Sequence, residues 1–200
     1  MGRSVTVSAL IKTFSAWDRI PVDVEEHVKP EFLKLGVKDE IYFWSDPKLN
    51  PAIIRGEIEY WDWPQPDGKK VNVADITFAQ QMDHEWRRLV CCKEMLHILD
   101  PVGIRVTSPE DIDKLVEKII LPSDLQDPFS DGIHALTDRV AITYAAAILF
   151  PLGARALLIK PYMDGKLPLV KVAEMAELPV RYAAVVLSEV WPEIHEMLVS

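Results

Sequence analysis

The chain is 200 residues long, 49% of them hydrophobic, with a formal net charge of −9 and a pI near 5.0. This length allows one compact unit with a core of its own, and the composition argues against disorder. The acidic balance argues against general binding to nucleic-acid backbones, which requires clustered lysine and arginine. Because the chain has no apolar run of about 18 residues and no signal-peptide pattern, we expect a cytoplasmic protein without a membrane span.

The first 50 residues predict a helical segment that packs on the core. Apolar residues recur at helical spacing in two stretches: Ile11, Phe14 and Trp17, then Val28, Phe32 and Leu35. Pro21 separates the two short helices, and Gly36 ends the second as a C-terminal cap. An aromatic run follows at residues 42–44, either as a strand or simply as part of the core.

A β-hairpin is predicted next. Residues 53–63 and 70–77 alternate between apolar and polar side chains, and the turn chemistry of residues 64–68 joins them. Trp61 and Trp63 are two residues apart and should share one face of their strand. Such a pair either forms a platform for an extended peptide or packs beneath a helix, which is the more frequent arrangement.

Helices are predicted for most of the remaining chain. Residues 83–100 are apolar on most of their helical surface, so this helix should be buried. It contains the only cysteines, Cys91 and Cys92, which are poorly placed for a disulfide and are expected to be small buried residues in a reducing compartment. Further helices are expected at residues 108–120, 133–150, 153–160, 170–177 and 179–187, with a polar connection at 122–132.

Within the helix at residues 83–100, Lys93, Glu94 and His97 form the pattern K-E-x-x-H. The related pattern H-E-x-x-H belongs to zincin metallopeptidases, in which two histidines on one helix face bind Zn²⁺ and the glutamate is the general base on a zinc-bound water. Lys93 stands at the first histidine position. A lone E-x-x-H is a weak signal, because such short patterns occur by chance in many helices.

A second segment makes the pattern more specific. Residues 138–151 resemble a helix of the ImmA/IrrE family of zincin-like metallopeptidases, which has the form E-x-x-A-x-x-F-A-x-x-L-L-x-P. The matching residues are Asp138, Ala141, Tyr144, Ala145, Ile148, Leu149 and Pro151. The hairpin, with Arg87 and Arg88 after it, and the helix-turn-helix-like residues 170–187 extend the resemblance to about residues 50–190.

The resemblance implies an α+β fold, in which a small hairpin or sheet packs on the buried active-site helix of a zincin-like core and a helix-turn-helix-like region follows. We divide the chain into an N-terminal helical segment (1–50), a zincin-like domain (51–160) and a small helical region (161–200), which form one compact unit overall. In function, the resemblance implies a zinc peptidase that cleaves a transcriptional repressor, with Glu94 as general base and His97 and Asp138 as metal ligands.

Lys93 argues against a zinc site. An ammonium has no lone pair for a metal, and two nearby carboxylates would favour its charged form. We therefore expect Lys93 to take the place of the metal and to form an ion pair with Glu94 and Asp138. On this hypothesis no cofactor is bound, and zinc is expected only if the protein is an active enzyme.

Two further residues could belong to the site. His134 lies four residues before Asp138 and is the candidate third ligand of an active zinc enzyme. Asp100, three residues after His97, either holds that imidazole as a hydrogen-bond acceptor or caps the following loop. The histidines that lie outside these motifs are expected at the surface: His27 and His195.

These residues predict a degenerate ImmA/IrrE-like protein that acts through protein binding, with a transcriptional regulator as the expected partner. Whether it is an enzyme stays open, because the alternative is an active zinc peptidase with an altered ligand set. A third hypothesis is a helix-turn-helix regulator in which the zincin pattern is incidental. Residues 170–187 contain only Lys171 and Arg181 as positive charges, so nucleic-acid binding is not expected.

Overall fold

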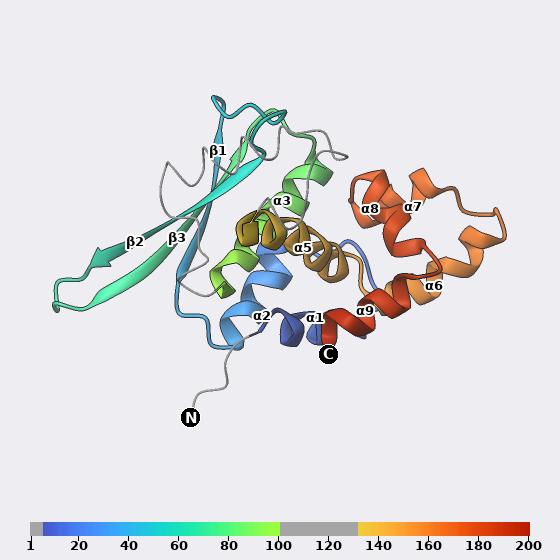
Figure 1. The fold of residues 1–200 in the computed structure, drawn as a ribbon, viewed down its shortest axis with the longest axis horizontal. Helices are drawn as coiled ribbons and strands as arrows, with labels where there is room; N and C mark the ends of the chain where they lie inside the picture. The colour runs from blue at the N-terminus through green and yellow to red at the C-terminus, as the bar shows by residue number, and fades with distance from the viewer. Residues whose placement is uncertain (1–5, 101–131) are drawn as a thin grey trace.

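A small sheet and a set of helices on one side of it make up the part of the chain that the structure describes (Figure 1). The structure is a computed structural model that describes residues 6–100 and 132–200, with the helical backbone alone for residues 132–139. The expected α+β class is confirmed. The helix predicted at residues 108–120 and the connection from residue 122 to residue 131 lie outside the described residues.

The sheet has three strands in the order β1-β3-β2. Strands β2 (Gly56–Pro64) and β3 (Lys70–Ala79) pair antiparallel, as the predicted hairpin requires, and Gly68 in their turn has a φ of +81° that favours glycine. Strand β1 (Glu40–Asp46) contains the aromatic run and pairs parallel with β3. The sheet therefore includes a strand from the segment 1–50.

The N-terminal helices form where the apolar spacing predicts them. Helix α1 spans Val7–Ser15, with the Thr6 side chain accepting a hydrogen bond from the Ala9 N–H at 3.2 Å. A π-helical turn, η1 (Val24–Val28), leads into α2 (Lys29–Lys34), and Gly36 follows with a φ of 109°. The apolar residues of these helices are fully buried: Ile11, Phe14, Val28 and Phe32.

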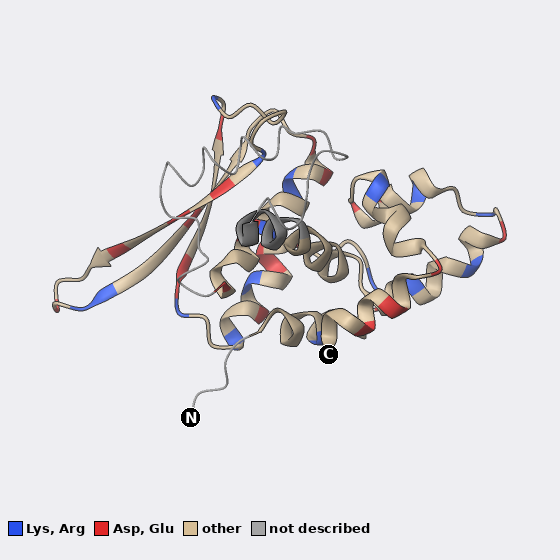
Figure 2. Cartoon of the chain, in the orientation of Figure 1, with Lys and Arg blue, Asp and Glu red and all other residues tan. Residues whose placement is uncertain are grey.

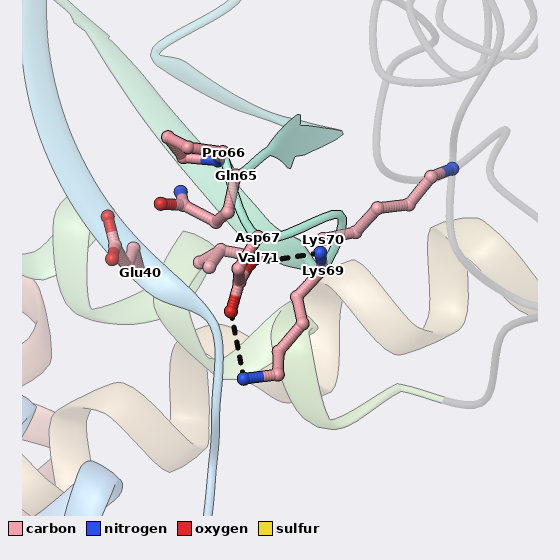
Figure 3. Close-up of a pocket in the computed structure, with 7 residues that line it drawn as sticks. All are labelled: Glu40, Gln65, Pro66, Asp67, Lys69, Lys70 and Val71. Atoms are coloured by element: carbon pink, nitrogen blue, oxygen red, sulfur yellow. Dashed lines mark hydrogen bonds and ion pairs between the residues drawn. The ribbon is translucent and has the colours of Figure 1, made fainter.

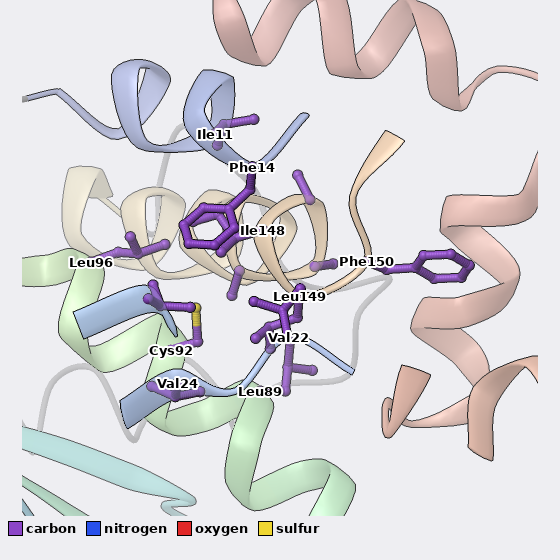
Figure 4. Packing of buried hydrophobic residues seen from close by; sticks show 14 of the residues in the cluster. Ile11, Phe14, Val22, Val24, Leu89, Cys92, Leu96, Ile148, Leu149 and Phe150 are labelled. Carbon is purple, nitrogen blue, oxygen red and sulfur yellow. The ribbon is translucent and has the colours of Figure 1, made fainter. Parts of the chain in front are cut away.

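Helix α3 (His84–Leu96) lies between the sheet and α5 (Gly132–Leu149), and a 3-10 turn, η2 (His97–Leu99), continues it. Figure 4 shows Leu89, Cys92 and Leu96 of α3 packed against Ile148 and Leu149 of α5. Burying this apolar surface stabilises the fold at about 25 cal/mol for each Å² removed from water. The prediction of a buried helix is confirmed.

Both cysteines are buried free thiols, as predicted. Burial raises the pKa of Cys92 to about 12 and raises the pKa of Cys91 as well, because a low-polarity environment disfavours the thiolate. Burial therefore favours the thiol over the thiolate, which is the reactive form of cysteine.

The C-terminal region consists of α6 (Leu152–Met163), α7 (Leu169–Ala176), α8 (Val180–Leu187) and α9 (Trp191–Val199). Three of these helices were predicted, whereas α9 was not. Its signal is Trp191, His195 and Leu198 at helical spacing, obscured by Pro192 near its start, a position where proline is tolerated. Helix α9 packs on α1, and the Ser8 hydroxyl donates to the Val199 carbonyl at 3.0 Å.

Two buried arginines fix α7 and α8 to the rest of the molecule. Arg88 of α3 donates to the carbonyls of Ala176 and Glu177 at 2.9 and 2.6 Å. Arg155 of α6 donates to the carbonyls of Val186 and Ser188 at 2.7 and 2.9 Å. Each cation satisfies carbonyls that a helix C-terminus leaves without a partner and also complements the negative end of the helix dipole.

Candidate functional site

Lys93 and Glu94 of the K-E-x-x-H pattern lie in the last turn of α3, which packs between the sheet and α5, and His97 begins η2. The Lys93 ammonium is 2.8 Å from Oε1 of Glu94, and the two side chains are only 12% and 5% exposed. A charge removed from water to this extent requires an opposite charge or hydrogen bonds close by. Lys93 supplies a positive charge at the position where a zincin helix has its first histidine.

Strand β2 approaches this pair closely at Gly56. A Cβ atom at that position would lie 2.4 Å from Cγ1 of Val90 and 3.3 Å from Oε1 of Glu94. The strand therefore needs glycine to pass over α3 at this point. The sequence analysis did not identify Gly56 as part of the site, although glycine at the start of a strand is a signal of close backbone approach.

His97 and Asp100 form a second polar pair one turn further along. Nδ1 of His97 is 2.7 Å from Oδ2 of Asp100, and both side chains are mostly buried, at 15% and 19% exposure. An ionised carboxylate only accepts hydrogen bonds, so Nδ1 of His97 is the donor in this contact. Asp100 was expected either to hold this imidazole or to cap the following loop. The contact shows the first role, because it orients the imidazole of His97.

The remaining predicted site residues, His134 and Asp138, belong to α5. Their backbone is helical and α5 packs along α3, so the structure brings the two predicted motif helices together. The side chains of residues 132–139 lie outside the described part. The predicted ion pair between Lys93 and Asp138 therefore stays a prediction, as does His134 as a metal ligand.

The described side chains do not fit a catalytic zinc ion. Such a site takes three protein ligands with nitrogen, oxygen or sulfur lone pairs and keeps a fourth position for water. Among the side chains that the structure describes, no group of three or more His, Cys, Asp and Glu residues could hold a metal ion. Lys93 also places an ammonium beside the glutamate that would act as base. No catalytic step through zinc follows from this arrangement.

The N-terminal end of α3 is a structural junction. Nε2 of His84 is 2.9 Å from Oε2 of Glu177, and the buried Arg88 guanidinium is 3.4 Å from the same oxygen. Arg55 and Arg181 both stack on the ring of Trp86, each 4.4 Å from its centroid. These contacts hold the α7–α8 turn and the start of β2 against α3.

The two positive charges of the helix-turn-helix-like residues 170–187, Lys171 and Arg181, both contact other side chains of the chain. Arg181 stacks on Trp86 and donates to the Tyr182 hydroxyl at 2.8 Å, while Lys171 forms an ion pair with Glu174 at 2.9 Å. A DNA-reading helix presents its cations to the phosphate backbone. Both cations of α7 and α8 instead have partners within the molecule.

The prediction of a surface position is wrong for His195. Its side chain is 4% exposed, and Nε2 lies 3.1 Å from the Ser15 hydroxyl between α9 and α1. Burial lowers the pKa of His195, because the charged imidazolium loses its hydration. His27 is half-buried, and its Nδ1 accepts a hydrogen bond from the Asp23 N–H at 2.9 Å.

Trp61 and Trp63 lie exposed on the side of the sheet away from α3. Their side chains are 44% and 47% exposed, and their ring centroids are 5.9 Å apart. The structure shows that the two rings are exposed, and whether they bind an extended peptide stays a prediction. Packing beneath a helix, the arrangement that was expected more often, does not occur among the described residues.

A shallow hollow lies at the far end of the sheet. Figure 3 shows this hollow of about 420 Å³ between the start of β1 and the turn of the hairpin; it is lined by Glu40, Gln65, Pro66, Asp67, Lys69, Lys70 and Val71. Lys69 lies 2.9 Å from Asp67, and hydrogen bonds from Lys69 lower the pKa of that carboxyl group. Lys70 lies 2.9 Å from Asp62. Both lysines of the hairpin are thus neutralised by neighbouring carboxylates.

Comparisons of the chain with protein-family models, with curated proteins and with solved structures found no match. In residues 6–100 and 132–200 no single helix is both long and apolar enough to cross a bilayer. The segments Val140–Leu149 and Leu152–Met163 reach that length only together, and the chain bends by 79° between them.

Proposed function

We propose that this protein is a non-catalytic, protein-binding regulatory module with an ImmA/IrrE-like, zincin-like core, in which the Lys93 ammonium takes the place of the zinc ion. The partner that fits the resemblance is a transcriptional regulator. Two free, buried thiols fit the reducing compartment that a cytoplasmic location provides.

The observation that carries this proposal is the buried contact between Lys93 and Glu94 at 2.8 Å. In a zincin the glutamate must reach a metal-bound water and accept its proton. Here the whole Glu94 residue is 3% exposed, and an ammonium lies against its carboxylate. A carboxylate held in this way stabilises the helix that carries it and is a poor base for water.

The two alternative functions have less support. An active peptidase would need a metal ligand at the position of Lys93, whose ammonium has no lone pair to donate and lies against Glu94. A helix-turn-helix regulator needs cations free to contact phosphate, whereas Arg181 and Lys171 are engaged within the molecule.

Metal analysis tests the proposal directly. Protein purified without added metal should contain well under one zinc per chain, and a broad set of peptide substrates should remain uncleaved. Zinc close to one equivalent per chain, lost together with a peptidase activity on treatment with a chelator, would overturn the proposal.

The variant Lys93→His tests the zincin-like core separately. It restores H-E-x-x-H, with the imidazole of His97 already oriented by Asp100. We expect K93H to bind zinc in a calorimetric titration, and we expect the matched variant Lys93→Gln to bind none. A folded K93H that fails to bind zinc would contradict the zincin-like reading of α3 and α5.

A further inference from the structure

The outer face of the sheet is a surface of aromatic and acidic side chains. Strand register and alternation define this face, because directly paired residues point to the same side and their neighbours point to the other. Trp61, Val73 and Glu40 lie opposite one another, as do Glu59, Asp75 and Tyr42. By register, the outward positions are Glu40, Tyr42, Trp44 and Asp46 of β1, Glu57, Glu59, Trp61 and Trp63 of β2, and Val71, Val73, Asp75 and Thr77 of β3. Among them Val73 is fully buried.

Asp75 holds the aromatic rings in place at the centre of this face. Its carboxylate accepts from Nε1 of Trp44 at 2.9 Å and from Nε1 of Trp61 at 2.7 Å, one from each neighbouring strand. The rings of Trp61 and Trp63 are tilted by 32° to each other, and so are those of Tyr42 and Trp44. Two aromatic pairs are therefore oriented on either side of one acidic side chain.

These rings are exposed to solvent. The side chains of Tyr42, Trp44, Trp61 and Trp63 are 38%, 55%, 44% and 47% exposed. The described helices lie on the opposite side of the sheet (Figure 1). An exposed cluster of large aromatic side chains is a mark of an interaction surface, since single exposed apolar residues are common but contiguous ones are not.

Charge indicates which kind of partner fits this face. The outward positions of the strands include five carboxylates, Glu40, Asp46, Glu57, Glu59 and Asp75, and no lysine or arginine. Figure 2 shows acidic residues along the strands, and basic residues at the hairpin and near the other ends of the strands. Partial burial raises the pKa of Glu57, and the charges of Glu59, Glu94 and Asp46 raise it further. The face is thus crowded with negative charge that a cation would relieve.

We propose that the outer face of the sheet, defined by Trp44, Trp61, Trp63 and Asp75, binds a positively charged, arginine- or lysine-containing peptide segment of a partner protein. Cations stack on the exposed rings, as guanidinium and ammonium groups do on tryptophan, and pair with the surrounding carboxylates. This proposal rests on the protein-binding part of the proposed function and is independent of the zinc argument.

Other occupants satisfy this face less well. A neutral sugar stacks on tryptophan but leaves the carboxylates without a counter-charge, and an anionic membrane surface is repelled by them. A second copy of the chain would bring five further carboxylates against the first five. A basic peptide satisfies both the rings and the charge.

A peptide titration tests the proposal on the full-length chain. The probe is an eight-residue peptide of alternating arginine and serine, followed by tryptophan fluorescence and calorimetry at about 150 mM salt, where long-range attraction is screened. The matched peptide with citrulline in place of arginine keeps the shape and removes the charge. We expect the arginine peptide to bind at least about tenfold more tightly than the citrulline peptide.

Variants locate the binding. Trp61→Ala, Trp63→Ala and Asp75→Asn should each weaken binding of the arginine peptide by about tenfold. The control Glu193→Gln/Glu196→Gln removes two exposed charges from α9, far from the sheet in sequence and on the other side of the molecule (Figure 1), and should change affinity less than about twofold. The hydrogen bonds to Asp75 come from Trp44 and Trp61, so Trp63→Ala tests the contribution of a ring alone if the other variants disturb the sheet.

Several outcomes would overturn this proposal. The first two are an α9 control that weakens binding of the arginine peptide as much as the sheet variants do, and a citrulline peptide that binds as tightly as the arginine peptide. The others are tighter binding of a neutral oligosaccharide or of phosphatidylcholine vesicles than of the arginine peptide, and a dimer of the chain that Trp61→Ala abolishes. The two proposals fail separately. Stoichiometric zinc would remove the proposed function and leave this surface standing, whereas a failed titration would remove the surface and leave the Lys93 result unchanged.

Discussion

The two sides of the three-stranded sheet differ in where their charged side chains lie and in how these are compensated. On the inner side the sheet packs on α3, and the charged pair Lys93–Glu94 is buried with a separation of 2.8 Å. On the outer side five carboxylates accompany four exposed aromatic rings, and the strands place no cation among them. The inner charges are compensated within the molecule, and the outer ones are available to a partner.

This difference separates residues that hold the fold from residues that recognise something else. A buried pair has little exposure to a ligand, and losing one member removes an opposite charge from beside the other in a low-polarity environment. Exposed rings and carboxylates add little to stability, because water solvates them in the unfolded chain as well. Substitutions on the two sides should therefore differ in which property they change.

The largest effect is expected from Lys93→Met. Removing the ammonium leaves the Glu94 carboxylate buried without this partner, so the free energy of unfolding should fall by roughly 3 to 5 kcal/mol. Urea or guanidinium denaturation followed by circular dichroism measures it.

The double variant Lys93→Met/Glu94→Leu is the control for this result. Replacing both charges by apolar groups removes the buried charge altogether, so the double variant should be more stable than K93M alone. If the changes in the free energy of unfolding caused by the two substitutions simply added, Lys93 and Glu94 would not be coupled. The ammonium would then not compensate the carboxylate.

A smaller effect is expected at Gly56, where the inner side of β2 meets α3. In Gly56→Ala the new methyl group meets Cγ1 of Val90 at 2.4 Å, so strand and helix must separate, at a cost of roughly 1 to 3 kcal/mol. Adding Val90→Ala removes the clashing methyl group. Denaturation of both single variants and of the double variant measures their free energies of unfolding. Val90→Ala should lower this free energy less in the Gly56→Ala chain than in the wild type. Equal losses would contradict the close approach of β2 to α3.

The third prediction concerns pH and a buried group outside the sheet. Burial lowers the pKa of His195 in the folded chain below its ordinary value near 6.5, so the unfolded chain binds the proton more readily. Stability from this group is complete above about pH 6.5 and declines as the pH falls through the window down to the lowered pKa. Unfolding measured from pH 7.5 to pH 5 should show this decline, and His195→Gln should flatten it. An equally steep decline in H195Q would assign the effect to other groups.

The smallest effect on stability is expected on the outer side. Trp44→Ala removes a side chain that is 55% exposed, together with one hydrogen bond to Asp75, and should cost only about 0.5 to 1 kcal/mol. The same variant should lose most of its binding to the arginine peptide. If Trp44→Ala lowered the free energy of unfolding as much as K93M and still bound the arginine peptide, the outer side would hold the fold and would not recognise the peptide.

Local patterns accounted for most of the elements. Apolar spacing predicted α1, α2, α3, α5, α6, α7 and α8, and the turn at residues 64–68 predicted the hairpin, because these depend on neighbours in the chain. Helix α9 was missed, since Pro192 concealed a helix whose apolar residues are satisfied only by packing on the distant α1. His195 was misplaced for the same reason.

The sites divide in a similar way. The sequence alone identified Lys93 as the residue that separates this chain from a zinc enzyme, because the chemistry of an ammonium does not depend on the fold. It also placed Trp61 and Trp63 on one face of a strand. It did not identify Gly56, whose role depends on how closely β2 approaches α3.

The sequence by itself determined which side chains are charged, which are aromatic and which segments are helices or strands, since these follow from residue chemistry and local periodicity. The tertiary structure alone decided which charges are buried together and which are left facing water. Pairing β1 with β3 brought Trp44 beside Asp75, 31 residues away, and turned two separate aromatic runs into one surface. Contacts of this kind depend on how distant segments pack, which no local pattern specifies.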